Sequence, residues 1–270
     1  TGTVATATQN SITTATGLTA VGATQQLTTI AGIPLYSDST SLYTHNVSGT
    51  DSTATNNTAI GFTAMDAITT GDSNAALGYG ALGANTTGSY NAATGRGALV
   101  ANTTGDNNIA TGASSLRYNT TGDSNIAVGY RALYTNVTNN NNVAVGHEAL
   151  YNNIADDNTA VGKDALHANT TGDYNVALGR DALTANTTGA SNLAIGTNTM
   201  AANTTGTRNI AIGNEAYDSS DTENDNLAIG YQAMTANTAG GQYNVAIGNY
   251  AADALTSGDN NTAVGYEALS

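Results

Sequence analysis

The pattern Asn-x-Ala-x-Gly occurs thirteen times in this chain, and each copy lies seventeen positions after the one before, except for one interval of sixteen and one of eighteen. Repetition at a fixed period is the sequence signature of repeat architectures. A unit of this length is too short for a helical-hairpin repeat, which needs about 33 to 47 residues. The motif asparagines are Asn57, Asn74, Asn91, Asn108, Asn125, Asn142, Asn158, Asn175, Asn192, Asn209, Asn226, Asn244 and Asn261, and the motif glycines are Gly61, Gly78, Gly95, Gly112, Gly129, Gly146, Gly162, Gly179, Gly196, Gly213, Gly230, Gly248 and Gly265.

The residues inside and after the motif predict strands and turns. The x positions are mostly Ile, Val and Leu and alternate with small residues, as in the segment 125–129. This period of two is typical of a β-strand. A polar stretch such as 186–189 (Asn-Thr-Thr-Gly) follows and has turn chemistry. The sequence therefore predicts an all-β fold, a parallel β-solenoid of about thirteen 17-residue coils stacked about 4.8 Å apart.

Each position of the repeat has an expected place in such a coil. We expect the two x side chains and the Leu of each coil to point inward, where each large aliphatic contributes about 1.5–3 kcal/mol. The motif asparagines are expected to stack as an internal ladder, and the glycines to permit a sharp bend. The alanines, such as Ala127, Ala144 and Ala177, would then form a small face on the opposite side. That face suggests self-association along the rod, unless a second strand of the same coil covers it.

The repeat divides the chain into two regions. Residues 54–270 form the repeat domain, whereas residues 1–53 are Thr-rich, contain Pro34 and do not follow the repeat. We interpret residues 1–53 as a connector or cap. Since the chain opens on Thr1 and stops within a coil at Ser270, we expect a processed chain or a fragment whose last strand edge is covered by more chain or by another subunit.

Composition narrows the possible partners and sites. The chain has no cysteine, which excludes disulfides and thiolate metal sites. Its net charge of −14 argues against binding nucleic acid by phosphate neutralisation. No apolar run reaches the roughly 18 residues of a membrane span, so we expect no membrane insertion.

The repeat resembles that of a known group of fibrous proteins. The segment 209–213 (Asn-Ile-Ala-Ile-Gly) matches the Asn and the Ala-Ile-Gly of the Asn-Ser-Val-Ala-Ile-Gly motif of YadA-like head repeats in trimeric autotransporter adhesins, but lacks one residue after Asn. The longer unit, Ala-Asn-Thr-Thr-Gly-x-x-Asn-x-Ala-x-Gly-x-x-Ala-Leu, is similar to repeats of phage tail-fibre-like proteins. The resemblance covers about residues 54–270. It implies a left-handed β-roll, a homotrimer and an extracellular setting on a virion tail fibre or a cell surface, although the family's usual repeat is nearer fourteen residues.

Catalytic signals are weak. The histidines His45, His147 and His167 show no spacing typical of a serine–histidine–acid arrangement. Paired carboxylates can hydrolyse glycosides, but Glu148 and Asp164 stand in a column of the repeat and are explained by it. We therefore expect no enzyme activity and no catalytic residues.

Two further columns bear on ligands. Acidic residues in the turn before the motif would stack about 4.8 Å apart and could hold calcium, but local hydrogen bonding is the favoured interpretation, so we expect no cofactor. Aromatic residues either contact sugars or a protein partner, or form a plain ladder, which we favour. The acids are Asp72, Asp106, Asp123, Asp156, Asp173 and Asp259; the aromatics are Phe62, Tyr79, Tyr130, Tyr231 and Tyr266 after the glycine, and Tyr90, Tyr174 and Tyr243 before the asparagine.

Together these features predict a non-enzymatic extracellular fibre module that acts as a structural spacer and adhesin. Its expected partners are further copies of itself, as a homotrimer, and a host cell surface or glycan. The alternative is a subunit of a self-assembling extracellular filament joined end to end. A polysaccharide-degrading tailspike is a less favoured hypothesis.

Overall fold

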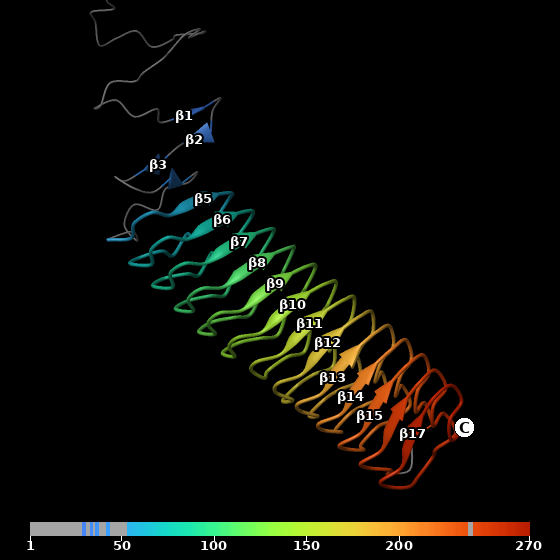
Figure 1. Ribbon diagram of the computed structural model, residues 1–270. Helices are drawn as coiled ribbons and strands as arrows, with labels where there is room; N and C mark the ends of the chain where they lie inside the picture. Colours follow the sequence, from blue (N-terminus) through green and yellow to red (C-terminus); the bar gives the residue numbers. More distant parts are fainter. Residues whose placement is uncertain (1–28, 31–32, 35, 38–41, 44–52, 237–239) are drawn as a thin grey trace, which may run out of the picture.

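The computed structural model describes residues 29–30, 33–34, 36–37, 42–43, 53–236 and 240–270. Over these residues the chain forms strands and turns and no helix, and the coils stack into a rod (Figure 1). Most of the expected connector at residues 1–53 lies outside the described residues. Among those described, no helix has the length and apolar content that a membrane crossing requires.

The strands form one long sheet and one small hairpin. Strands β4 to β17 pair in parallel in chain order, β3 joins β4 antiparallel, and β1 pairs with β2. The prediction of an all-β parallel solenoid is confirmed. The strands are β1 Thr29–Ile30, β2 Ile33–Pro34, β3 Tyr36–Ser37, β4 Leu42–Tyr43, β5 Thr58–Ile60, β6 Ala75–Leu77, β7 Ala92–Thr94, β8 Ile109–Thr111, β9 Ile126–Val128, β10 Val143–Val145, β11 Thr159–Val161, β12 Val176–Leu178, β13 Leu193–Ile195, β14 Ile210–Ile212, β15 Leu227–Ile229, β16 Val245–Ile247 and β17 Thr262–Val264.

Equivalent positions of successive repeats lie next to each other. Val143 of β10 pairs with Ile126 of β9 on one side and with Thr159 of β11 on the other. The coil between Val143 and Thr159 is one residue shorter than the usual repeat, and the coil between Leu227 and Val245 is one residue longer. Register is kept in both cases because the turns absorb the length change, as expected for loops.

The alternation of side chains along each strand is the reverse of the expected one. The central alanine of every strand from β5 to β17 is buried, whereas its two neighbours, the x residues, are half-buried or exposed. The expectation that the x side chains point inward and the alanines outward is therefore wrong. The reason is the strand period: the motif asparagine is also buried, and residues two apart share a face, so Ala must lie inside with Asn.

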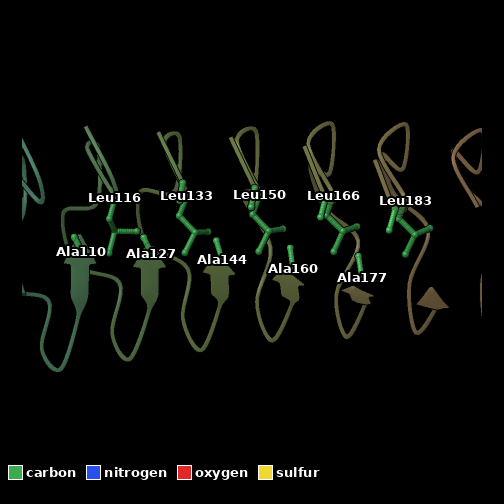
Figure 2. Packing of buried hydrophobic residues seen from close by; sticks show 14 of the residues in the cluster. Ala110, Leu116, Ala127, Leu133, Ala144, Leu150, Ala160, Leu166, Ala177 and Leu183 are labelled. Atoms are coloured by element: carbon green, nitrogen blue, oxygen red, sulfur yellow. The ribbon is translucent and has the colours of Figure 1, made fainter. Parts of the chain in front are cut away.

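The core is a thin double column of alanine and leucine. Leu133, four residues after Gly129, is fully buried, and so are its equivalents Leu116 and Leu150. Figure 2 shows these leucines, carried by the far side of each coil, pointing toward the strand alanines. Because the leucines fill most of the interior, only a methyl group fits on the strand side.

The motif asparagines form a continuous ladder. In each of the twelve coil-to-coil steps, Oδ1 of one asparagine accepts the backbone N–H of the next at 2.8–3.0 Å. The amide Nδ2 donates to a turn carbonyl; in Asn175, for example, it donates to Gly189 O at 2.8 Å. All but Asn261, which is half-buried, are buried. Each carboxamide thus accepts a backbone N–H that would otherwise pair with a backbone carbonyl, and it connects the start of the strand to the turn by a hydrogen bond.

A second asparagine ladder was not predicted. Asn186, which the sequence places in a polar turn, is fully buried. Its Nδ2 donates to Asn169 Oδ1 in the previous coil at 2.8 Å and to Gly189 O at 2.9 Å. The same arrangement recurs at Asn102 and Asn119. The asparagine and glycine of this turn therefore line the core, while its second threonine, Thr188, stays exposed.

The motif glycines are required on two grounds. Gly129 has a φ of 139°, a conformation that L residues rarely adopt. A Cβ at Gly129 would lie 2.2 Å from the carbonyl oxygen of Gly146 in the next coil. The bend after each strand thus depends on both the free dihedral and the close approach of stacked backbones.

Candidate interaction surface

The outward face of the long sheet is a strip of aliphatic side chains. On β9 to β16, fifteen of the sixteen outward positions hold Ile, Val or Leu, the exception is Thr159, and none is charged. Leu178 is 45% exposed and Ile210 is 40% exposed, although both lie in the middle of the run of regular strands. The strip becomes less apolar toward β5, where Thr and Ala alternate with Ile and Leu.

This strip is a large continuous apolar surface for a single chain. The eight three-residue strands β9 to β16 at about 4.8 Å spacing span about 38 Å, and three residue positions across a strand span about 10 Å, which gives about 400 Å². Stable, specific interfaces bury about 800 Å² on each partner, so the strip would supply about half of such an interface and the bordering columns the rest. Exposed apolar patches larger than a few hundred Å² are rare on monomers and mark interaction sites.

The strip is bordered by polar and aromatic columns. One border is the position before the motif asparagine, where Arg208 donates two hydrogen bonds to Asp225 of the next coil, at 2.6 and 2.7 Å. The Arg208 guanidinium lowers the pKa of the Asp225 carboxyl, which therefore stays ionised. The other border is the position after the glycine. An apolar centre with a polar rim is the usual anatomy of an interface.

The aromatic residues do not form one ladder along the rod. Phe62 and Tyr79 stack at 5.9 Å between ring centroids, and Tyr130 lies beside His147 at 5.3 Å. The regular stack is a different set that the sequence analysis missed. Tyr134, Tyr151 and His167 follow one another with centroids 5.0 and 5.2 Å apart and rings within 5° of parallel. Because they occupy the same position in three successive coils, an alignment of the repeats would have revealed this column.

The acidic turn residues accept hydrogen bonds from the backbone of the preceding coil. Oδ1 of Asp106 accepts the backbone N–H of Ser89 at 2.7 Å, and Oδ1 of Asp123 accepts that of Asp106. Asp72, Asp156, Asp173 and Asp259 make the same bond to the preceding coil. These bonds account for an acid in the turn without any ion, and the less favoured alternative of calcium binding there stays untested.

The two histidines of the repeat domain come close to one glutamate. His147 and His167 both lie within 4.0 Å of Glu148. His45 lies outside the described residues. No family model, curated protein or solved structure matches the chain.

Proposed function

We propose that the chain is a non-enzymatic fibre module whose rods associate with one another through the outward aliphatic strip of the sheet. The observation that carries the proposal is the burial pattern of the strands. Ala is inside and Ile, Val and Leu are outside in every strand from β9 to β16, with the single exception of Thr159. A solenoid that served alone in water would have polar residues at these outward positions.

Further copies of the same chain are the occupants that fit this strip best. The strip is flat, periodic and uncharged, so it is complementary to itself, whereas the chain as a whole carries a net charge of −14. Mutual repulsion of two acidic rods is weakest where the charged columns are absent. Sheets pack face to face about 10 Å apart with interlocking side chains, and aliphatic columns repeating at about 4.8 Å satisfy that geometry.

The proposed number of chains and the proposed extracellular location rest on the sequence resemblance, not on the geometry of the rod. The similarity to YadA-like head repeats and phage tail-fibre repeats favours three chains, an extracellular location and a spacer or adhesive role. The rod supports the spacer role, because each described coil of the repeat domain hydrogen-bonds to its neighbours. The exposed tyrosines at the rim, such as Tyr174 and Tyr243, are the proposed contacts to a cell surface or glycan.

Negative-stain electron microscopy of the full chain tests this function. We expect discrete rods with a repeat region about 60 Å long and threefold symmetry in end views. Continuous filaments would instead support the end-to-end alternative. Rods one chain wide at micromolar concentration would contradict the proposal.

A further inference from the structure

Four potential metal ligands from two neighbouring coils converge on one stretch of the rod surface. His147 and Glu148 follow β10, and Asp164 and His167 follow β11. Nδ1 of His147 lies 4.0 Å from Glu148 Oε2 and 3.8 Å from Asp164 Oδ1. Nε2 of His167 lies 3.7 Å from the same Glu148 oxygen. These separations are too long for hydrogen bonds, so the ligand atoms face one another across a gap.

The carboxylates are turned so that one oxygen of each faces the imidazoles. Glu148 Oε1 lies 3.6 Å from Nη1 of Arg131, which leaves Oε2 toward both histidines. Asp164 Oδ2 lies 2.5 Å from Nζ of Lys163, which leaves Oδ1 toward His147. Lys163 therefore orients the Asp164 carboxylate in the way that outer partners orient metal ligands, whereas Arg131 is too far from Glu148 for a hydrogen bond and supplies only a charge contact.

The imidazoles are held by aromatic neighbours. His147 lies beside the ring of Tyr130, with 5.3 Å between centroids, and His167 stacks on Tyr151 at 5.2 Å and 5°. Side chains restricted in this way lose less conformational entropy when they bind an ion.

We propose that His147, Glu148 and Asp164, whose ligand atoms all lie within 4.8 Å of one another, bind a divalent ion of the Zn²⁺ class. His167 lies outside that group of three, but its Nε2 is 3.7 Å from Glu148 Oε2, and a rotation of its side chain would make it a fourth ligand. Zn²⁺ binds imidazole nitrogen and carboxylate oxygen at about 2.0–2.2 Å, so tetrahedral ligand atoms lie about 3.4 Å apart. The nitrogen-to-oxygen separations of 3.7–4.0 Å need a contraction of a few tenths of an ångström, and the other separations, which extend to no more than 4.8 Å, need up to about 1.4 Å. The side chains are between 20% and 49% exposed, which leaves room for water in the coordination sphere.

The repeat explains the acids of this cluster but not its histidines. The column of Glu148 and Asp164 continues with Asp181 in the next coil and Glu215 further on. Within the described residues, imidazoles occur only in the coils of β10 and β11, one residue after the motif glycine in the first coil and five residues after it in the second. The imidazoles also set the ion class, because Ca²⁺ takes six to eight oxygen ligands, whereas imidazole suits Zn²⁺.

Calorimetric titration of the metal-free full chain with Zn²⁺ tests the site. We expect one equivalent to bind with a Kd in the micromolar range, and His147→Ala and Glu148→Gln each to weaken binding at least tenfold. Asp181→Asn, in the same column one coil away, is the matched control and should bind as the parent does. In imidazole NMR spectra, His147 and His167 should shift on addition of Zn²⁺ while His45 does not.

Three results would overturn the site. These are the lack of saturable binding at 100 µM Zn²⁺, equal affinity in His147→Ala and Asp181→Asn, or full competition by millimolar Ca²⁺, each of which would indicate general attraction to an acidic surface. Circular dichroism of every variant establishes that the solenoid is retained.

Discussion

The backbone N–H of Asn192 donates to Oδ1 of Asn175, one coil earlier, at 3.0 Å. The same carboxamide donates through Nδ2 to Gly189 O at 2.8 Å, so a single side chain connects a strand, the next strand and a turn. Asn175 is fully buried. Any side chain that cannot both accept and donate at this position leaves buried backbone groups without partners.

Replacing Asn175 with Leu should therefore cost more than the loss of a packing contact. Leaving a buried donor and a buried acceptor unpaired costs about 1–3 kcal/mol each, so we expect a loss of about 2–6 kcal/mol in the free energy of unfolding. Chemical denaturation measures it. Asn214→Ala, at an exposed position after a motif glycine, should change stability by less than about 0.5 kcal/mol. Equal effects of the two substitutions would contradict the ladder.

The motif glycines should not tolerate any side chain, because a Cβ there would clash with the next coil. Gly80, two residues after a motif glycine, has room for a side chain. Gly129→Ala places a Cβ 2.2 Å from Gly146 O at a φ of 139°, and we expect a loss of at least about 1–3 kcal/mol from backbone strain alone. Gly80→Asn is the control. Gly80 has a φ of 67°, its nearest neighbour would lie 3.7 Å from a Cβ, and the equivalent residue Arg131 adopts a φ of 51°. A melting temperature that falls equally in both variants would contradict this account.

Because the x residues of the strands point outward, substituting one of them should cost less stability than substituting a buried leucine. Leu150→Ala removes a fully buried side chain, and such changes cost about 2–5 kcal/mol. Val145→Thr changes an outward residue of β10 and should cost less than about 1 kcal/mol when measured on dissociated chains at low concentration. The opposite order of the two losses would restore the original expectation that the x residues form the core.

One coil should respond to acid differently from the others. Glu223 occupies the place of the turn glycine and is buried. Burial raises the pKa of its carboxyl, but hydrogen bonds from Ser220 Oγ and from the backbone N–H groups of Asp221 and Thr222 lower it by more, so the pKa lies below its ordinary value. A folded-state pKa below the unfolded one stabilises the protein above the unfolded pKa of about 4.3. That contribution is lost as the pH falls through the folded value.

Restoring the consensus in this coil should remove the acid response. In Ser220→Asn/Glu223→Gly, the new amide can donate to the carbonyl of residue 223, as Asn186 does to Gly189. Melting curves between pH 3 and pH 6 should show a smaller acid loss in this variant than in the parent. Identical pH profiles would show that Glu223 carries no stabilising charge.

The sequence predicted the register of the fold well because register depends on periodicity alone. Thirteen copies of one motif fix which residues stack, and the pairing of Val143 with Ile126 follows directly. Which face of the strand is buried depends on a comparison of volumes. Hydrophobicity favoured Ile and Val inside, but so short a coil leaves a narrow interior, and Leu133 and its equivalents already fill it. The buried motif asparagine, expected correctly, implied the right face through the strand period.

The site residues that the sequence predicted are those that recur in every repeat, and the ones it did not predict depend on the folded coil. The asparagine and glycine columns were visible because they are invariant across the repeat. The second ladder, at Asn186 and its equivalents, was read as turn chemistry because an Asn-Thr-Thr-Gly stretch carries the same residues in a solvated loop. The convergence of His147 and His167 on Glu148 was missed, since it combines columns that are not adjacent in sequence and come together only when the coil closes.

Sedimentation equilibrium of the parent and of Ile195→Lys/Ile229→Lys tests the central claim most directly. These two residues lie on the aliphatic strip two coils apart, and Thr171→Lys/Thr205→Lys places the same charges on exposed turn positions as the control. We expect the parent and the control to sediment at three times the chain mass of 27.0 kDa, and the strip variant to sediment as a monomer with unchanged circular dichroism. A parent that is monomeric at micromolar concentration, or a strip variant that still associates, would contradict the account.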